Sequence, residues 1–443
     1  MVAGMLFERF LKFRHEMAWV LLGQFLGFTG SFIGIKVLTT LMGPKGYGQL
    51  ALGLTIAGLF NMYIYGPLAN VVARFYTVYR ERNLLPVYCA VLRKGHLVLG
   101  GTLLLLAGIT VLVLRTFESP WALIAGVAIL YGVAGGVNAS FIAAQNALRQ
   151  RRIVALHQGA DVWLRTGLSI LLLHIAGKSG HMALLGYALG TLLITCSQAI
   201  FARKNPEIRQ ALEHMPHDPD AVRACRREFL RYAAPFVFFA GFAAVSMYAD
   251  RWVIQYISGE NALGIYAAIY AIASSPVNLL FALVNQLMVP IIFEKAGALS
   301  SPEQVRQSET LVSHTILFSG AAMAVMIILA WLLGKPLITL LTMEVFAEHH
   351  HVLWIVMLGL SLFNIGQVMA LKGIYSNCPN IYMLPKGLQA ASFLVMAYFL
   401  ALSHGIEGVA AALCISSLIY IALVYYVNTT IRLEFGAGPT PSR

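Results

Sequence analysis

The chain has 443 residues, of which 59% are hydrophobic and only 11% are charged. A soluble domain carries about 25% charged residues, so this composition excludes an ordinary soluble globular protein and is typical of a polytopic membrane protein. The formal net charge of +12 would suggest a nucleic-acid partner in a soluble chain, but here it must first be compared with the membrane topology.

The predicted elements are apolar segments that can cross a bilayer, since a spanning helix needs about 20 mainly apolar residues. In chain order they cover residues 17–41, 47–72, 91–114, 120–147, 153–176, 182–202, 229–257, 262–292, 310–333, 351–376, 381–403 and 406–431. The piece at 336–350 is too short to span and is expected to be re-entrant or interfacial. The predicted fold class is therefore an all-α polytopic membrane protein with about twelve transmembrane helices.

The chain divides into two halves of six predicted helices. Residues 1–202 form the N-terminal bundle, residues 203–228 a cytoplasmic linker, and residues 229–443 the C-terminal bundle with a short cytoplasmic tail. The linker contains both signs of charge and is expected to be partly helical. The tail "GAGPTPSR" is expected to be disordered. The first apolar segment is longer than the core of a signal peptide and is expected to remain as a membrane helix.

The Lys and Arg residues in the connections predict the orientation. With the N-terminus in the cytoplasm, nearly all of them fall on the cytoplasmic side, and only Lys45, Arg115, Lys178 and Lys335 fall outside. This asymmetry follows the positive-inside rule and predicts that both termini are cytoplasmic in a cell (inner) membrane. It also accounts for most of the net charge without nucleic acid.

Two stretches repeat across the halves with a shift of 216 residues. "LTTLMGPKGYGQLALGLTIAGL" (38–59) aligns with "IQYISGENALGIYAAIYAIASSP" (254–276), so that Gly43 meets Gly259 and Gly48 meets Gly264. Each stretch joins the first two helices of its half, which predicts a parallel internal repeat. The glycines do not have the spacing of a phosphate-binding loop, so we interpret each stretch as a tight helical hairpin.

These stretches and their surroundings resemble one transporter family. "LTTLMGPKGYGQLALGLTIAGLF" followed by "ARFYTVYRER", and "MYADRWVIQYISGENALGIYAAIYAIASSPVNLLFALVNQLMVPII" in the second half, are similar to Wzx-type polysaccharide (O-antigen and exopolysaccharide) flippases. These belong to the multidrug/oligosaccharidyl-lipid/polysaccharide exporter superfamily. The resemblance implies two six-helix bundles around a central cavity that opens alternately to each side, and a lipid-linked oligosaccharide as cargo.

Charged residues inside the predicted helices are the first candidates for a binding site, because a charge at mid-membrane costs at least about 2.5–3.5 kcal/mol. Once the Lys and Arg residues assigned to the connections are set aside, four basic residues remain (Lys36, Arg165, Arg251 and Lys372), and Asp161 and Asp250 join them as acidic candidates. The four cations are predicted to hold an anionic headgroup in the cavity. The alternative is that they snorkel or pair locally and serve only helix packing.

The helix at 153–176 contains the stripe His157, Asp161 and Arg165, spaced four residues apart. Arg165 is predicted to bind phosphate, and Asp161, Asp250 and His157 to pair with the cations or to hold a coupling ion. Further polar side chains are candidates for the cavity lining or for contacts between helices: Asn138, Gln145, Asn278, Asn285, Asn364 and Gln367.

No metal site is expected. The five cysteines are scattered without a CxxC pair, and they predict neither metal ligands nor a disulfide framework. The run "EHHH" (348–351) invites a zinc interpretation, but three successive residues on a regular helix point about 100° apart and cannot converge on one ion. No second cluster of ligands accompanies this run in the sequence.

The main functional hypothesis is a flippase that moves a lipid-linked (polyprenyl diphosphate) oligosaccharide across the cytoplasmic membrane by alternating access, for surface polysaccharide synthesis. The rivals are an ion-coupled drug or metabolite antiporter on the same scaffold, a lipid II flippase, which has two more helices, and a membrane enzyme. The short outer connections argue against an enzyme. We expect a monomer with no cofactor, possible coupling to an H⁺ or Na⁺ gradient, and other polysaccharide-assembly proteins as partners.

Overall fold

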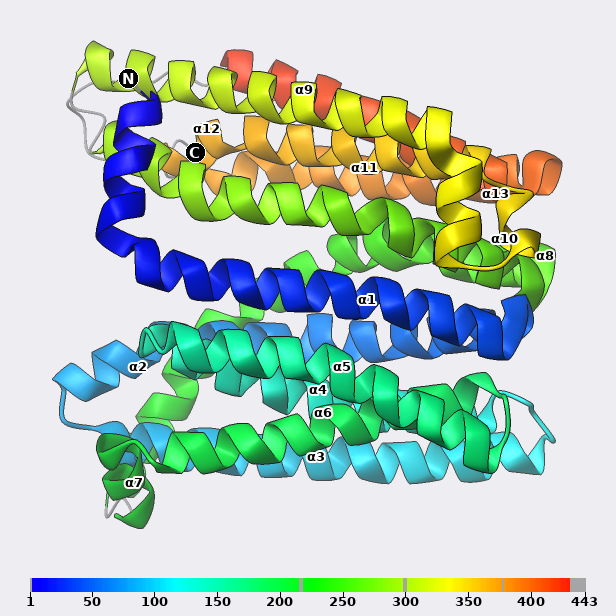
Figure 1. Ribbon diagram of the computed structural model, residues 1–443. Coiled ribbons are helices and arrows are strands. Elements are labelled where there is room, and N and C mark those ends of the chain that lie inside the picture. Colours follow the sequence, from blue (N-terminus) through cyan, green and yellow to red (C-terminus); the bar gives the residue numbers. More distant parts are fainter. Residues whose placement is uncertain (1, 215–217, 298–300, 377, 431–443) are drawn as a thin grey trace. The chain divides into compact units, whose positions relative to one another are not determined.

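A computed structural model describes residues 2–214, 218–297, 301–376 and 378–430, with side chains from residue 18 onward. The predicted tail lies outside this description. The described chain is helical, without a strand, as the fold class predicted (Figure 1). The elements are α1 (Val2–Phe60), the π-helix η1 (Asn61–Tyr65), α2 (Gly66–Glu81), α3 (Leu85–Thr116), α4 (Ala122–Ala147), α5 (Arg151–Ala176), α6 (Gly180–Arg203), α7 (Pro206–Glu213), α8 (Pro219–Ala296), α9 (Pro302–Leu341), α10 (Glu344–Ala347), α11 (His351–Met369), α12 (Leu371–Tyr375), the 3₁₀-helix η2 (Pro379–Tyr382) and α13 (Met383–Thr430).

Three of these helices are too long for one crossing. At 1.5 Å per residue, the 59 residues of α1 would extend roughly 90 Å, three times the bilayer's hydrocarbon core. Each helix contains a glycine with positive φ: Gly43 (65°) in α1, Gly259 (80°) in α8 and Gly405 (55°) in α13. Residues with a Cβ rarely adopt a positive φ, so glycine allows the backbone to reverse direction there. Gly43 and Gly259 are the two hairpin positions that the internal repeat predicted.

The number of crossings agrees with the twelve that the sequence predicts. Eight helices of the described chain are long and apolar enough to cross a membrane. The three that contain a glycine turn each supply two crossings. α5 is as long as α4, with 26 residues, but its mean hydropathy is lower because it contains charged residues. Counting α5 as a further crossing brings the number to twelve.

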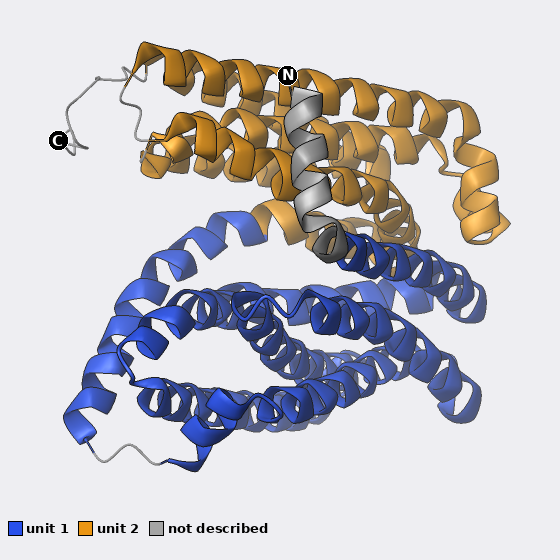
Figure 2. Ribbon diagram, turned by 60° about the vertical axis from the view of Figure 1, so that its left-hand side comes forward, with its two compact units in different colours: residues 1–244 blue, residues 245–443 orange. Residues whose placement is uncertain are grey.

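The chain forms two compact units, Met1–Ala244 and Val245–Arg443 (Figure 2). The boundary between them falls within α8, whereas the predicted division was the linker 203–228; those predicted domain limits stay a prediction. Within unit 1, α5 packs against α1 and α6, and α4 packs against α6 and α3. Within unit 2, α11 packs against α13 and α9.

The linker region folds onto unit 1. Asn205 caps α7 by accepting hydrogen bonds from the backbone nitrogens of Glu207 and Ile208 at 3.0 and 3.3 Å. The Tyr79 hydroxyl of α2 donates to Glu228 at 2.7 Å, and Arg80 pairs with Glu207 at 2.6 Å. A buried cluster of Tyr, Phe, Val, Ala and Cys side chains from α2, α3, α7 and the start of α8 lies beneath these contacts. Part of the region is helical, as expected.

The segment 336–350 differs from its expected form. α9 continues through Pro336 to Leu341, and a short helix, α10, follows at Glu344–Ala347. The apolar start of the segment therefore belongs to a spanning helix. Proline is tolerated inside this helix because surrounding groups in a membrane bundle can satisfy the backbone carbonyl that loses its partner.

Candidate functional site

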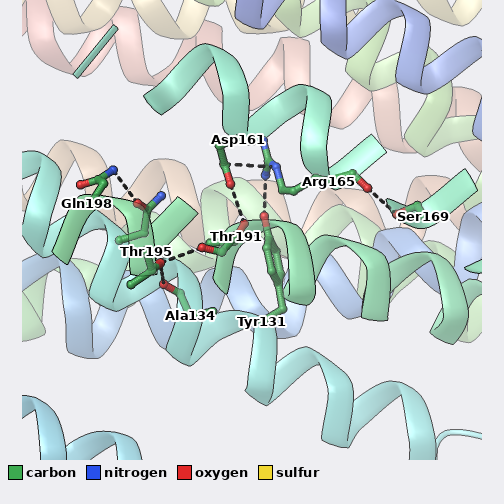
Figure 3. A network of polar contacts seen from close by, with 9 residues as sticks. Tyr131, Ala134, Asp161, Arg165, Ser169, Thr191, Thr195 and Gln198 are labelled. Atoms are coloured by element: carbon green, nitrogen blue, oxygen red, sulfur yellow. Dashed lines mark hydrogen bonds and ion pairs between the residues drawn. The ribbon is translucent and has the colours of Figure 1, made fainter. Parts of the chain in front are cut away.

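A buried ion pair lies between α4, α5 and α6 of unit 1. Asp161 and Arg165 are four residues apart on α5, and Asp161 Oδ2 lies 3.2 Å from Arg165 Nε. Arg165 Nη1 donates to the Tyr131 hydroxyl of α4 at 2.6 Å, and the guanidinium lies 5.2 Å from the ring centroid of Tyr187 on α6. Only 21% of the Arg165 side chain is exposed. Figure 3 shows Tyr131 pointing toward the guanidinium from the neighbouring helix.

Two glycines of α6 bring its backbone close to α5. A Cβ on Gly190 would lie 2.7 Å from the backbone nitrogen of Arg165, and one on Gly186 would overlap the backbone of Ser169. A pair of glycines four residues apart is a common device for close helix contact in membranes. The Ser169 hydroxyl lies 2.8 Å from the Arg165 carbonyl and 2.6 Å from the Ala183 carbonyl, and its donation to Ala183 further joins the two helices. The sequence therefore positions Arg165 through residues that have no charge.

Polar contacts extend from the ion pair along α6. The Thr191 hydroxyl donates to Asp161 Oδ1 at 2.8 Å, and the Thr195 hydroxyl donates to the Thr191 carbonyl at 2.7 Å. Further along, Gln198 Nε2 donates to Asn138 Oδ1 at 2.7 Å (Figure 3). Asn138 is thus used in a contact between α4 and α6. Both carboxylate oxygens of Asp161 have a partner, as a buried carboxylate requires.

His157 lies on the same helix but does not contact the ion pair. Its Nδ1 lies 2.8 Å from the Ile153 carbonyl, and its Nε2 lies 3.0 Å from the Ser197 hydroxyl. The imidazole is 7% exposed and packs edge-on against Phe201. The i, i+4 spacing correctly indicated one face of α5, but only Asp161 and Arg165 meet there. His157 instead joins α5 to α6.

Unit 2 contains a second aspartate–arginine pair, on α8. Arg251 Nη1 lies 3.3 Å from Asp250 Oδ1 and donates to the Met247 carbonyl at 2.7 Å. The guanidinium lies 4.7 Å from the ring centroid of Tyr270 and 5.7 Å from that of Tyr248. The side chains of Arg251 and Asp250 are 15% and 4% exposed. Among the described residues, each unit thus holds one largely buried Arg–Asp pair whose arginine lies beside two tyrosines.

The two predicted lysines have different surroundings. Lys372 lies in the short helix α12, and its Nζ pairs with Glu309 of α9 at 2.7 Å; the Glu309 side chain is 44% exposed. Lys36 is half-buried on α1, and its carbonyl accepts hydrogen bonds from the hydroxyls of Thr39 and Thr40. Arg251 contacts other residues of α8, whereas Lys372 contacts Glu309 of α9. Among the described contacts of unit 2, none links Arg251 to Lys372.

The remaining predicted polar residues do not form one lining. Gln145 is buried, and neither its Nε2 nor its Oε1 has a hydrogen-bond partner among the described residues. Asn278 and Asn285 are exposed on α8. Asn364 donates to the Leu360 carbonyl at 2.9 Å within α11, and Gln367 is half-buried on the same helix. Their role in binding stays a prediction.

Four tyrosines beside the arginines were not among the predicted site residues: Tyr131, Tyr187, Tyr248 and Tyr270. Three of them lie on helices or half-helices other than that of their arginine, and tyrosine is too common in membrane helices to be informative alone. Gly186 and Gly190 were a usable signal, since their spacing predicts a close helix contact. That contact indicates which face of α6 meets α5.

Residues 13–295 match the model of a protein family that is described as polysaccharide biosynthesis protein. This match covers more than half of the chain. The chain belongs to that family. No match to a curated protein was found.

The fold of this family member is similar to those of two kinds of solved transporter. A structure named lipid II flippase MurJ, inward closed conformation, superposes with a TM-score of 0.67 at 14% identity, covering 94% of this chain and 87% of that one. An inward-facing multidrug resistance MATE family transporter of the MOP superfamily superposes with a TM-score of 0.62 at 14% identity, covering 93% and 95%. At 14% identity, these superpositions show a shared fold and no more, and the cargo has to be argued from the site.

Proposed function

We propose that this protein is a flippase for a lipid-linked oligosaccharide whose carrier is a polyprenyl diphosphate. It moves the headgroup across the cytoplasmic membrane by alternating access of its two units, acts as a monomer and uses no cofactor. Membership in a polysaccharide biosynthesis family and the flippase-like and exporter-like fold support this proposal.

The observation that supports this cargo best is the Arg165 cluster. A diphosphate needs cationic donors in a site shielded from water, and arginine presents several N–H donors in a plane that matches phosphate oxygens. The described contacts of Arg165 use Nε and Nη1, toward Asp161 and Tyr131. Asp161 neutralises the guanidinium before cargo arrives, because an unpaired charge at this depth would be costly.

The proposed binding step exchanges one anionic partner for another. A phosphate oxygen takes the place of the Asp161 carboxylate, and that carboxylate keeps its hydrogen bond from Thr191, which is 2.8 Å long in this structure. Arg251 acts in the same way in unit 2, with Asp250 as its resting partner. Uptake of H⁺ or Na⁺ by either aspartate would release its arginine, and this is the route by which an ion gradient would couple to transport. Lys36 and Lys372 are supporting cations in this proposal.

The antiporter alternative meets a specific difficulty. A cationic drug would need an available carboxylate, but Asp161 and Asp250 each lie within 3.3 Å of an arginine nitrogen. A drug cation would have to displace a guanidinium that is held by hydrogen bonds and by tyrosine rings. A lipid II flippase remains the closer alternative, because its cargo would meet the same need for cations.

Complementation tests the proposal. In a flippase-null strain, Arg165→Ala and Arg251→Ala should abolish surface polysaccharide while the protein stays inserted at wild-type levels. Arg209→Ala is the matched control, because Arg209 forms an exposed pair with Glu213 on α7. Normal polysaccharide in both test variants would rule out these arginines as the headgroup site. Resistance to cationic dyes in place of polysaccharide export would favour the antiporter.

A further inference from the structure

Three potential metal ligands from distant parts of the chain meet at one end of unit 2. His349 Nδ1 and His351 Nε2 each lie 3.1 Å from the same oxygen, Oε1 of Glu407. All three ligand atoms lie within 4.8 Å of one another. His349 lies in the turn after α10, and His351 is the first residue of α11. Glu407 lies two residues after the turn at Gly405 in α13.

The backbone explains why the run of histidines behaves differently from a regular helix. Residues 348–350 form a turn, and α11 begins only at His351. His349 and His351 therefore converge, while Nδ1 of the intervening His350 lies 3.1 Å from the Ala347 carbonyl. The prediction of no metal site is therefore wrong in both of its grounds, because residues 348–350 form a turn and Glu407 supplies a further ligand.

Neighbouring glycines fix this arrangement. The turn packs directly on α9, because a Cβ on Gly334 would lie 3.3 Å from the His350 carbonyl oxygen. The positive φ of Gly405 reverses the chain and brings Glu407 toward the histidines. Packing of α11 against α13 holds the two sides of the cluster together. The three ligands thus rest on helix ends whose backbone is well determined by packing.

The distances suit a tetrahedral metal ion. Zinc binds histidine nitrogen and carboxylate oxygen at about 2.0–2.2 Å, so two ligands at tetrahedral angles lie about 3.3–3.5 Å apart. The two N–O distances of 3.1 Å are close to that value. Two imidazoles and one carboxylate are the ligand set of many zinc sites that keep a fourth position open, and they disfavour Mg²⁺ and Ca²⁺, which prefer oxygen ligands.

We propose that His349, His351 and Glu407 form a binding site for one divalent ion of the zinc class. The side chains are 35%, 44% and 35% exposed, so the ion can enter from solvent and a water molecule completes its coordination. The charge pattern predicts that this end of unit 2 faces outside. The bound ion joins the connection before α11 to the turn of α13, and it thereby stiffens the outer end of this unit.

Metal binding to the full-length protein tests this proposal. The protein is purified in detergent with a tag that contains no histidine, freed of metal and titrated with Zn²⁺. We expect one Zn²⁺ per chain and a rise in melting temperature on addition of Zn²⁺. His351→Cys should retain binding because a thiolate can replace imidazole, while His351→Asn and Glu407→Gln should weaken it at least tenfold. With Co²⁺, a tetrahedral visible absorption band should appear in the wild type.

Histidines outside the cluster provide the matched controls. His350→Ala and His404→Ala should bind Zn²⁺ like the wild type, since His350 contacts the Ala347 carbonyl and His404 contacts Ser403. Absence of stoichiometric binding to the wild type would overturn the proposal. So would undiminished binding to the triple variant His349→Ala, His351→Asn and Glu407→Gln, because the ion would then be bound elsewhere.

Discussion

Gly190 of α6 lies so close to Arg165 of α5 that a Cβ at this glycine would stand 2.7 Å from the Arg165 backbone nitrogen. No rotamer change can relieve such a contact, because the atoms concerned are backbone. The close approach of the two helices brings Thr191 and Tyr187 to the Asp161–Arg165 pair. A residue without a side chain therefore determines the geometry of the candidate site.

Enlarging this glycine should separate the two helices. We expect Gly190→Leu to destabilise the folded protein by about 1–3 kcal/mol or more, as overpacking commonly does, and to reduce polysaccharide export. Thermal unfolding in detergent measures the first effect and complementation the second. Gly167→Ala on α5 is the control, because a Cβ there meets nothing within 4 Å and alanine favours the helix. Equal melting temperatures for Gly190→Leu and the wild type would contradict the packing argument.

The Tyr131 hydroxyl should matter more than the Tyr187 hydroxyl. Tyr131→Phe removes the oxygen that accepts from Arg165 Nη1 at 2.6 Å, and hydrogen bonds to charged groups contribute about 1.5–3 kcal/mol. Tyr187→Phe keeps the ring whose centroid lies 5.2 Å from the guanidinium. We expect a lower melting temperature and weaker export for Tyr131→Phe, and near wild-type behaviour for Tyr187→Phe. The reverse order would show that Arg165 is held chiefly by Tyr187.

Charge deletion at the buried pair separates packing from function. Asp161→Asn leaves Arg165 without its carboxylate, and breaking a buried pair costs about 3–5 kcal/mol. The double variant Asp161→Asn with Arg165→Gln removes both charges and should recover most of this stability. Under the proposed function, the double variant is stable but does not export polysaccharide. A stable double variant with normal export would assign the pair to helix packing alone.

The Lys372–Glu309 pair provides a test by charge reversal. The nitrogen–oxygen distance is 2.7 Å, and Glu309 is 44% exposed, so the pair should contribute at most about 1 kcal/mol. We expect Lys372→Glu to impair export, and the swap of Lys372→Glu with Glu309→Lys to recover the melting temperature but not export, because Lys372 is a supporting cation in the proposed function. Restored export in the swap variant would assign Lys372 to the pair with Glu309 alone.

Much of the fold can be predicted from local properties of the chain. A span is recognised by its length and apolarity, and a hairpin by a glycine between two spans, since only glycine adopts positive φ readily. Gly43 and Gly259 were found in this way, and the twelve crossings with them. The i, i+4 spacing of Asp161 and Arg165 likewise predicted their contact, because it depends on one helix alone.

The partners of these residues depended on the tertiary structure. Tyr131 reaches Arg165, Glu309 reaches Lys372 and Glu407 reaches His349 across separations that local periodicity does not encode. The length, apolarity and glycines of the sequence by themselves determined that this chain crosses a membrane many times and where it reverses. Only the packing of separate helices decided which polar groups meet. The surrounding hydrocarbon offers a buried charge no partner, so the partner has to come from a neighbouring helix or turn of the protein.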